Sequence, residues 1–421
     1  MTSPETLQPW FSEIGVVGLV PDRWEPQWQA RHHVLSRLAR YFQVVWLDEP
    51  TEWRRRCSLR EVVTRPLAED AQHPSLLQVY DPGFWFTPAR FGDWFLRKRL
   101  QRARNLLLSH GCRQIVLSIW RPDFAAALGQ IAHDLSCYHI DDEYSFSATE
   151  RELDEREKHL IQAVGQVFIH SPALMEKKGH LNPHTEFISN GVDYPAFARP
   201  VPEPEDLRHI PRPRIGYAGV LKAQLDWRLL LELSARHPQW SFVFVGQINP
   251  YADPGDPLRA MAARRNVYLL GTKSTAELVQ YPQHFDVCIM PYCMNAYTRY
   301  IYPLKLHEYL ASGTPVVTSP IRSVLSFSGV VALAESAEEW ARALGQALSP
   351  GATAASERER RQAVARAHDW EILVRRMAQV IMERFGPLAR SRWDALPPGF
   401  PAISRKPEAC DPELRNKCYS S

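Results

Sequence analysis

Short runs of β-branched and other apolar residues alternate with stretches of helical spacing along most of this chain. In the first half, apolar runs at 14–20, 44–47 and 115–120 are separated by such stretches. The alternation resumes with runs at 214–218 and 241–245. Neighbouring parallel strands need a long crossover, which a helix supplies, so the pattern predicts parallel sheets covered by helices. We therefore expect an α/β protein with two doubly wound halves.

A proline-rich segment separates the two rounds of alternation. Six prolines fall between 192 and 213, and proline at that density prevents regular strand pairing. We expect a first domain at 1–200, a linker at 201–212 and a second domain from 213. Further strands are expected at 137–140, 167–169, 186–188, 267–270, 286–290 and 315–318, and helices at 24–41, 225–236, 275–281, 303–311, 337–348 and 371–385.

Composition narrows the class of protein. The chain has 421 residues, enough for two α/β domains, and its apolar runs fall short of the roughly 18 residues of a membrane-spanning helix. Its seven cysteines are scattered without a Cys-x-x-Cys pair, which favours reduced thiols over disulfides or zinc. Because no charged leader precedes an apolar stretch, we expect a cytoplasmic protein. A net charge of only +3 argues against a nucleic-acid partner.

Charge is nevertheless uneven, because eleven lysines and arginines oppose five acidic residues between 54 and 104. The segment 90–104 places aromatic residues at one end of a band of cations. Such a segment suits contact with an anionic membrane surface that holds a lipid-linked acceptor. It equally suits a domain helix with its apolar stripe on the sheet and its arginines in water.

Glycines follow several strands of the second half, at the sheet edge where open parallel sheets bind ligands. Gly219 follows the strand at 214–218, so backbone there can approach a ligand closely. Gly271 ends a later strand and is followed closely by Lys273, while Lys222 lies three residues beyond Gly219. A tight turn with solvent-facing lysines would give the same pattern, but the residues also suit a phosphate-bearing ligand.

The segment 302–317, which reads YPLKLHEYLASGTPVV, carries the densest signal. Pro303 is typical of a helix first turn, whose free N–H groups and positive dipole end attract anions. Lys305 in that turn would oppose the dipole unless an anion lies opposite it. Glu308, one turn later, can accept hydrogen bonds from the two hydroxyls of a ribose. The spacing predicts a bound nucleotide diphosphate, although an exposed ion pair is the plainer interpretation.

This segment, Gly-Tyr-Ala-Gly at 216–219 and Phe285-Asp286-Val287 before Met290-Pro291 together resemble the donor domain of GT-B glycosyltransferases, in particular the family 4-like group of polysaccharide and glycolipid assembly. The resemblance implies two Rossmann-like domains facing across a cleft, the second at 213–368. His368-Asp369-Trp370 resembles the start of that family's last segment, which implies a helix at 369–390 that crosses back to the first domain. A proline-rich tail at 391–421 would follow.

The implied activity is that of a hexosyltransferase-type enzyme. It would move a sugar from a UDP- or GDP-linked donor to a hydroxyl of a glycan or lipid-linked acceptor, at the inner face of the membrane. Gly219, Lys222, Gly271, Lys273, Lys305 and Glu308 would bind the donor. We expect no cofactor and no metal, because the helix dipole and lysine can carry the phosphate charge. A nicotinamide-dependent oxidoreductase is disfavoured because no strand is followed by Gly-x-Gly-x-x-Gly.

One position departs from the family pattern. Many family 4 enzymes carry a glutamate eight residues before the ribose-binding glutamate, where it contacts the donor sugar. Here that residue is Tyr300, and the segment 292–301 contains no carboxylate. The donor sugar and the choice between retention and inversion therefore stay open. A non-catalytic nucleotide-sugar-binding protein on the same fold is the alternative.

Two acidic residues, Asp141 and Asp142, follow the strand expected at 137–140. Glycosyl transfer needs a base for the acceptor proton or a group that stabilises positive charge on the sugar, and either carboxylate suits, Asp142 first. An acidic helix N-terminus or a metal-chelating pair are the alternatives. By the resemblance, Gly18, Arg31 and His32 lie near the acceptor, whereas a histidine on such a helix is more often structural.

Overall fold

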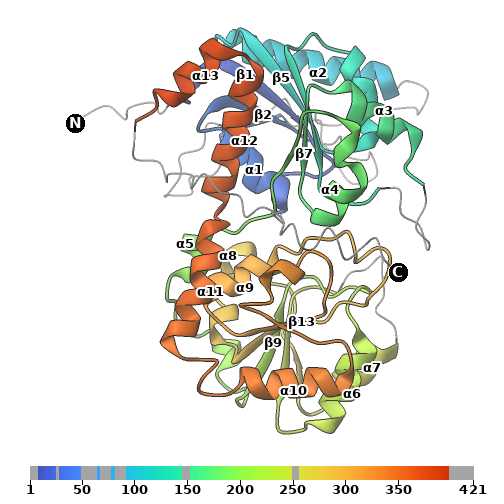
Figure 1. Ribbon diagram of the computed structural model, residues 1–421, viewed down its shortest axis with the longest axis vertical. Coiled ribbons are helices and arrows are strands. Elements are labelled where there is room, and N and C mark those ends of the chain that lie inside the picture. Colours follow the sequence, from blue (N-terminus) through green and yellow to red (C-terminus); the bar gives the residue numbers. More distant parts are fainter. Residues whose placement is uncertain are drawn as a thin grey trace, which may run out of the picture.

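Each round of strand–helix alternation forms its own sheet in the computed structural model, which describes residues 8–24, 28–48, 64–66, 77–80, 92–144, 152–248 and 256–397. Figure 1 shows the two sheets in two lobes, one above the other, each covered by helices. The expected doubly wound α/β class is confirmed. The proposed limits at 200, 212 and 368 stay predictions.

The first sheet has eight strands in the order β3-β4-β2-β1-β5-β6-β7-β8. All neighbours are parallel except β3 and β4. The central strands are apolar throughout because helices cover both faces. The strand order reverses between β1 and β5, where open sheets bind ligands. The strands are β1 (Phe11–Leu19), β2 (Phe42–Leu47), β3 (Thr64–Pro66), β4 (Leu77–Tyr80), β5 (Gln114–Ile119), β6 (Leu135–Ile140), β7 (Gln166–Ile169) and β8 (Thr185–Phe187).

The second sheet has six parallel strands in the order β11-β10-β9-β12-β13-β14. The strand order reverses between β9 and β12, at the centre of the sheet. The ligand site predicted from the glycines, at the carboxyl end of β9, therefore lies at this reversal, where open sheets bind ligands. The strands are β9 (Arg214–Ala218), β10 (Ser241–Val245), β11 (Val267–Leu269), β12 (Val287–Met290), β13 (Val316–Thr318) and β14 (Ala332–Leu333).

Helices cover both sheets of the described residues. In the first lobe they are α1 (Ala30–Leu38), α2 (Gly92–Ser109), α3 (Glu155–Ala163) and α4 (Pro172–Lys178). The second lobe carries α5 (Tyr194–Ala198), α6 (Trp227–Arg236), α7 (Asp256–Ala262), α8 (Thr275–Leu278), α9 (Lys305–Ser312), α10 (Ala337–Ala347) and α11 (Ala355–Ala367). The helices α6 and α10 lie close to the ranges expected from apolar spacing, while α3, α4, α5, α7 and α11 had no expected range. None of these described helices is long and apolar enough to cross a bilayer.

Three local predictions need correction. The helix expected from Trp24 begins at Ala30, and the helix expected at 275–281 ends at Leu278, before Pro282 starts a separate 3₁₀ turn. The helix expected from Pro303 begins at Lys305. Pro303 still shapes its start, because its carbonyl accepts the Leu306 N–H at 3.2 Å.

The proline-rich segment is packed onto the second lobe. Leu207 and Ile210 are buried in the same core as β9, and the Arg214 guanidinium donates to the carbonyls of both residues at 2.7 and 2.9 Å. Proline prevents strand pairing here, while two apolar side chains and one arginine fix the path of the segment.

The chain then returns to the first lobe through α12 (Trp370–Arg384) and α13 (Pro387–Asp394), which run along that lobe in Figure 1. Trp370, Val374 and Met377 are buried in a core cluster with residues of β1 and α1. At the crossing, Val192 N–H donates to the His368 carbonyl at 3.0 Å and Trp370 N–H donates to the Val192 carbonyl at 2.9 Å. Because α13 reaches Asp394, the tail expected from 391 begins within a helix.

Candidate nucleotide-sugar site

Glycines close the carboxyl ends of three neighbouring strands of the second sheet. Gly219 N–H donates to the Val245 carbonyl at 2.7 Å, and Gly246 N–H donates to the Gly271 carbonyl at 2.8 Å. All three glycines have positive φ, from +70° to +142°. A Cβ on Gly246 would lie 2.1 Å from the Gly219 oxygen. Side chains are thereby excluded where the three strands end, which leaves bare backbone at this edge.

Lys305, the first residue of α9, lies directly over Gly219. A Cβ on Gly219 would lie 2.2 Å from Lys305 Cε and 2.3 Å from its Nζ. The ammonium is also 5.4 Å from the centre of the Tyr217 ring. No side chain caps the start of α9; its Leu306 N–H bonds to the Pro303 carbonyl, and the positive end of the helix dipole lies at this point. Lys305 and the glycine edge of β9 thus form one surface.

Glu308 lies one turn further along α9, close to Lys305. It is partly buried, and burial raises the pKa of its carboxyl, while the Lys305 ammonium works in the opposite direction. A carboxylate at this depth can accept two hydrogen bonds from a diol.

Lys222 adds a second cation to the same place. Burial and then repulsion from Lys305 lower the pKa of Lys222 to about 8, against the attraction of Asp142. The ammonium groups of Lys222 and Lys305 repel each other and lie beside the start of α9, which no side chain caps. Together they make this part of the surface electropositive. An anion bound there would relieve the repulsion.

Asp142 comes from the first lobe and reaches the same region. Its Oδ1 accepts the Glu143 N–H at 2.8 Å. Burial, followed by repulsion from Asp141, raises the pKa of Asp142 to about 6. Asp141 is engaged on both oxygens, because Arg31 Nη1 donates to it at 2.6 Å and the Tyr144 hydroxyl at 2.5 Å. Asp141 is therefore neutralised by an arginine, whereas the contact to Asp142 Oδ1 comes from an uncharged backbone N–H.

Tyr297, which the sequence analysis did not predict for the site, contacts Asp142 from the other lobe. Its hydroxyl donates to Asp142 Oδ2 at 3.3 Å. Further contacts join the lobes nearby, since Asn190 Nδ2 donates to the Tyr302 carbonyl at 2.8 Å and Arg322 Nε donates to Glu176 at 3.0 Å. The carboxylate of the first lobe and the cations of the second thus share one region between the lobes.

Comparison with known proteins bears on the fold and on the family that the second lobe resembles. Residues 212–350 match the sequence model of the family described as Glycosyl transferases group 1. A 139-residue segment is 32% identical to TuaH of Bacillus subtilis strain 168, provisionally named a glycosyltransferase of teichuronic acid biosynthesis. The segment covers 32% of this chain and 34% of TuaH, so it spans about a third of that relative's length.

Solved structures match nearly the whole chain at low identity. The trehalose-6-phosphate synthase OtsA has a TM-score of 0.63 at 12% identity, covering 89% of this chain and 99% of its own. HepE of Anabaena, solved in complex with UDP, has a TM-score of 0.62 at 15% identity, covering 88% and 100%. WaaG, a glycosyltransferase of lipopolysaccharide biosynthesis, has a TM-score of 0.57 at 14% identity, covering 87% and 99%. The chain has the GT-B fold.

The other two residues predicted to bind the donor, Gly271 and Lys273, differ in where this GT-B fold places them. Gly271 shares the glycine edge, but its Cα faces open space. Lys273 lies beyond β11, the edge strand, and its ammonium pairs with Asp206 at 2.7 Å. The Tyr281 hydroxyl contacts the same carboxylate at 3.0 Å. The structure therefore engages Lys273 in a local ion pair and does not bring it to Lys305.

The residues predicted for the acceptor side also differ in where the structure places them. Arg31 reaches the site by pairing with Asp141, with Asp22 as its second partner. Gly18 serves packing instead, because a Cβ there would lie 2.7 Å from Leu35 Cδ1 of α1.

His32 is a buried structural residue in this structure, and its predicted place near the acceptor gains no support. Its Nδ1 accepts the Gln29 N–H at 3.0 Å, so Nε2 carries the proton and donates to the Arg23 carbonyl at 3.1 Å. Its ring lies 4.4 Å from the Trp46 ring centre and 5.5 Å from that of Trp24. Burial lowers the pKa of His32, which favours the neutral ring.

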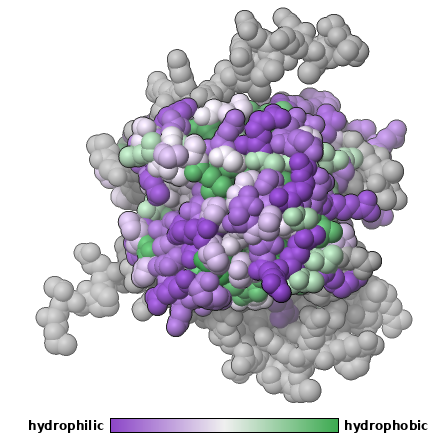
Figure 2. Space-filling view, turned by 90° about the horizontal axis from the view of Figure 1, so that it is seen from below, coloured by the Kyte–Doolittle hydropathy of each residue, from purple (hydrophilic) through white to green (hydrophobic). Residues whose placement is uncertain are grey.

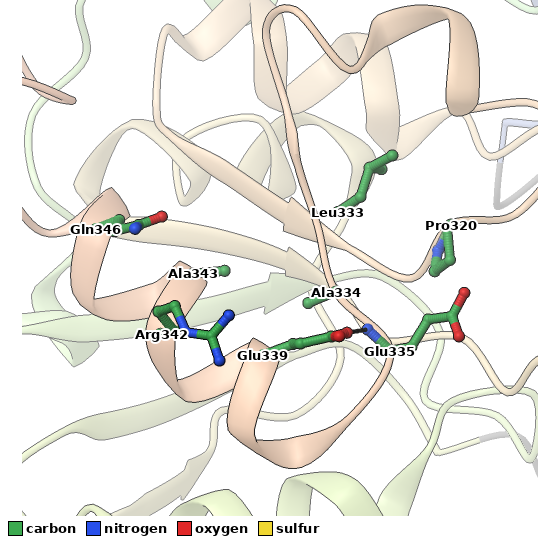
Figure 3. Close-up of a pocket in the computed structure, with 8 residues that line it drawn as sticks. All are labelled: Pro320, Leu333, Ala334, Glu335, Glu339, Arg342, Ala343 and Gln346. Carbon is green, nitrogen blue, oxygen red and sulfur yellow. Dashed lines mark hydrogen bonds between the residues drawn. The ribbon is translucent and has the colours of Figure 1, made fainter.

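One hollow among the described residues lies away from this region. It measures about 520 Å³ and is an open hollow between β14 and α10, lined by residues that include Leu333, Glu335 and Arg342 (Figure 3). Glu339 spans part of its floor by accepting the Glu335 N–H at 2.9 Å. Since β14 is the edge strand farthest from β11, three positions from β9, this hollow takes no part in the site. The end of the second lobe seen in Figure 2 is mostly hydrophilic, with small separate hydrophobic groups.

Proposed function

We propose that this protein is a glycosyltransferase that moves a sugar from a UDP- or GDP-linked donor to an acceptor hydroxyl in polysaccharide or glycolipid assembly. The observation that carries the proposal is the convergence of Lys305, Lys222 and Glu308 at the carboxyl end of β9 and the start of α9. The glycosyl transferases group 1 match covers these residues, and HepE on the same fold was solved with UDP.

The arrangement suits the departure of a nucleotide diphosphate. In the reaction, the bond between the sugar C1 and the diphosphate oxygen breaks, and C1 bonds to the acceptor oxygen. Negative charge grows on the diphosphate, and the two lysines and the α9 N–H groups are already in place to stabilise it. Glu308 would hold the ribose hydroxyls, which fixes the donor relative to these cations. This chain needs no metal for that task, and unchanged activity in excess EDTA is the expected outcome.

Asp142 would serve the acceptor step. With a pKa of about 6, its carboxylate is ionised at neutral pH and can take the acceptor proton or stabilise positive charge on the sugar. Asp141 is held by Arg31 and is the weaker candidate for this role. The sugar, the base and the stereochemical outcome are left open by these residues.

The test is a thermal-shift panel of nucleotide diphosphates and their sugars. A ligand at 100 times its Kd stabilises the folded protein by about 2.7 kcal/mol. We expect one nucleotide series to raise the melting temperature of the wild type, and Lys305→Ala to abolish the rise. The matched control is Lys158→Ala, since Lys158 is exposed and pairs with Glu155 on α3. Equal shifts in both variants would remove the basis of the site.

The alternative is a protein that binds nucleotide sugars without turnover. It is favoured by Tyr300, which stands where the resemblance to family 4 implies a carboxylate and is 4% exposed within the first-lobe core. Transfer and donor hydrolysis measured for wild type and Asp142→Asn separate the two. Turnover that Asp142→Asn reduces supports the enzyme, whereas binding without turnover in both proteins supports the alternative.

A lipid-linked acceptor and contact with an anionic bilayer through 90–104 belong to the same proposal, as does a cytoplasmic location. Within the described part of that segment, α2 buries Leu100 and Ala103 and exposes Trp94, Arg97 and Lys98. Lys98 Nζ lies 5.6 Å from the Trp94 ring centre. Sedimentation with vesicles of phosphatidylglycerol, compared with phosphatidylcholine, measures the contact. Equal sedimentation of wild type and Trp94→Ala would argue for the plain domain helix.

A further inference from the structure

The loop between β12 and α9 is shaped to present Tyr297. Asn295 N–H donates to Thr298 Oγ1 at 3.1 Å, and Thr298 N–H donates to Asn295 Oδ1 at 2.9 Å. The buried Thr298 hydroxyl also donates to the Cys293 carbonyl at 2.6 Å. This mutual bonding closes a single turn over 295–300. Tyr297 lies within the turn, and its side chain extends to the first lobe.

The same turn is anchored in the first lobe by Tyr300. This residue belongs to the second lobe in sequence, yet its ring is buried in a core cluster with Ile140 of β6 and Leu174 of α4. Lys177 Nζ lies 4.9 Å from the ring centre. The residue at the departure from the family pattern therefore joins the lobes in this structure.

Buried charged side chains of the first lobe fix the segment that carries Asp142. Lys178 Nζ lies 3.0 Å from Glu143 and 2.8 Å from Glu157, and the side chains of all three are at most 1% exposed. Glu143 in turn donates its N–H to Asp142 Oδ1. One carboxylate oxygen is thus fixed by the first lobe, and the other oxygen receives the Tyr297 hydroxyl.

We propose that Tyr297 is a positioning residue for Asp142, supplied by the second lobe through a turn that Tyr300 anchors in the first. This role rests on the proposed function, because it matters for sugar transfer only if Asp142 acts in the transfer. Because Tyr300 holds this turn in the first-lobe core, the Tyr297 hydroxyl stays within reach of Asp142, and the carboxylate is oriented by groups that come from both lobes in sequence. A hydrogen bond from a neutral donor also favours the ionised carboxylate.

The test is the proton affinity of Asp142, measured without reference to activity. The carboxyl carbon of Asp142 is followed by NMR titration of protein labelled in aspartate, with the resonance identified by its loss in Asp142→Asn. Tyr297→Phe keeps the ring and removes only the hydroxyl. We expect the proton affinity of Asp142 to rise about tenfold, a shift of about one pH unit. The matched control is Tyr281→Phe, which removes a tyrosine–aspartate contact to Asp206 and should leave the Asp142 titration unchanged.

A pH profile of transfer gives the second readout. In Tyr297→Phe the acid limb of kcat/KM should move to higher pH by the same amount, while the thermal shift given by nucleotide diphosphate stays that of the wild type. An unshifted Asp142 titration in Tyr297→Phe overturns the proposal. If the wild type transfers no sugar, the proposed function fails. The titration still decides whether Tyr297 lowers the proton affinity of Asp142.

Discussion

Replacement of Gly219 by alanine tests the site at the point where backbone and cation meet. The new Cβ would lie 2.2 Å from Lys305 Cε and 2.3 Å from Nζ, against an ordinary contact of about 3.5–4 Å. The obstructed atoms are the end of a flexible side chain, so the lysine moves away and the backbone stays. We therefore expect the ammonium to leave its position over β9.

The magnitude has two parts. Gly219 has φ of +137°, and a non-glycine residue held in such a conformation costs about 1–3 kcal/mol of stability. Loss of a hydrogen bond to a charged group costs about 1.5–3 kcal/mol, which corresponds to about 10- to 150-fold weaker binding of the nucleotide diphosphate. The second effect should appear only when ligand is present.

The assay is titration calorimetry with the nucleotide diphosphate that the thermal-shift panel identifies. Gly111→Ala is the matched control, because Gly111 has φ of +88° and nothing lies within 4 Å of its added Cβ. Both variants should lose stability, and only Gly219→Ala should lose affinity. Wild-type affinity in Gly219→Ala, or equal losses of affinity in the two, would refute the placement of Lys305 in the site.

Three further outcomes follow from the charges of the site. Lys178→Ala leaves the buried Glu157 without its cation, while Glu143 keeps Lys177 at 3.2 Å, and should cost about 3–5 kcal/mol, whereas Lys158→Ala should stay within about 0.5 kcal/mol of wild type; chemical denaturation measures both. Because the pKa of Lys222 is about 8, nucleotide affinity should fall as pH rises through 8, and Lys222→Arg should remove that dependence in calorimetric titrations from pH 7 to 9. The pKa of Asp142 is raised in the folded state, so the stability it contributes is present below about pH 4 and lost as pH rises through 6. Asp142→Asn should therefore gain melting temperature relative to wild type above pH 6, and an unchanged difference from pH 4 to 8 would contradict the burial of this carboxyl.

The central strands of both sheets could be predicted because their signals are local, whereas the edge strands β3 and β14 and the neighbouring β4 were not predicted. Apolar runs with a period of two or without interruption marked the strands, and the spacing of Lys305 and Glu308 on one helix predicted their shared surface. Gly219 was informative for the same reason, since its conformation is set by its own turn.

Contacts between distant segments could not be predicted in this way. Lys177 and Lys178 resemble the exposed end of a helix in sequence, and only the fold brings Glu143 and Glu157 around Lys178. Arg31 and Asp141 are 110 residues apart and satisfy each other's charge, which assigns the two neighbouring aspartates different roles. The resemblance predicted His32 near the acceptor, whereas in the structure its ring packs against Trp24 and Trp46, contacts that the local sequence does not indicate.

The chain crosses between the lobes twice, at Val192 and at Trp370. As a result, only one of the two lobes has its whole core within one continuous stretch of sequence. Residues 192–368 contain the second sheet and its core, so a fragment of that range carries everything its interior requires. The first lobe does not, because its interior is completed by Trp370, Val374 and Met377 from beyond the second lobe. The second lobe is therefore an insertion within the first, and a polypeptide that stops at residue 368 would expose the unfilled side of β1 and α1.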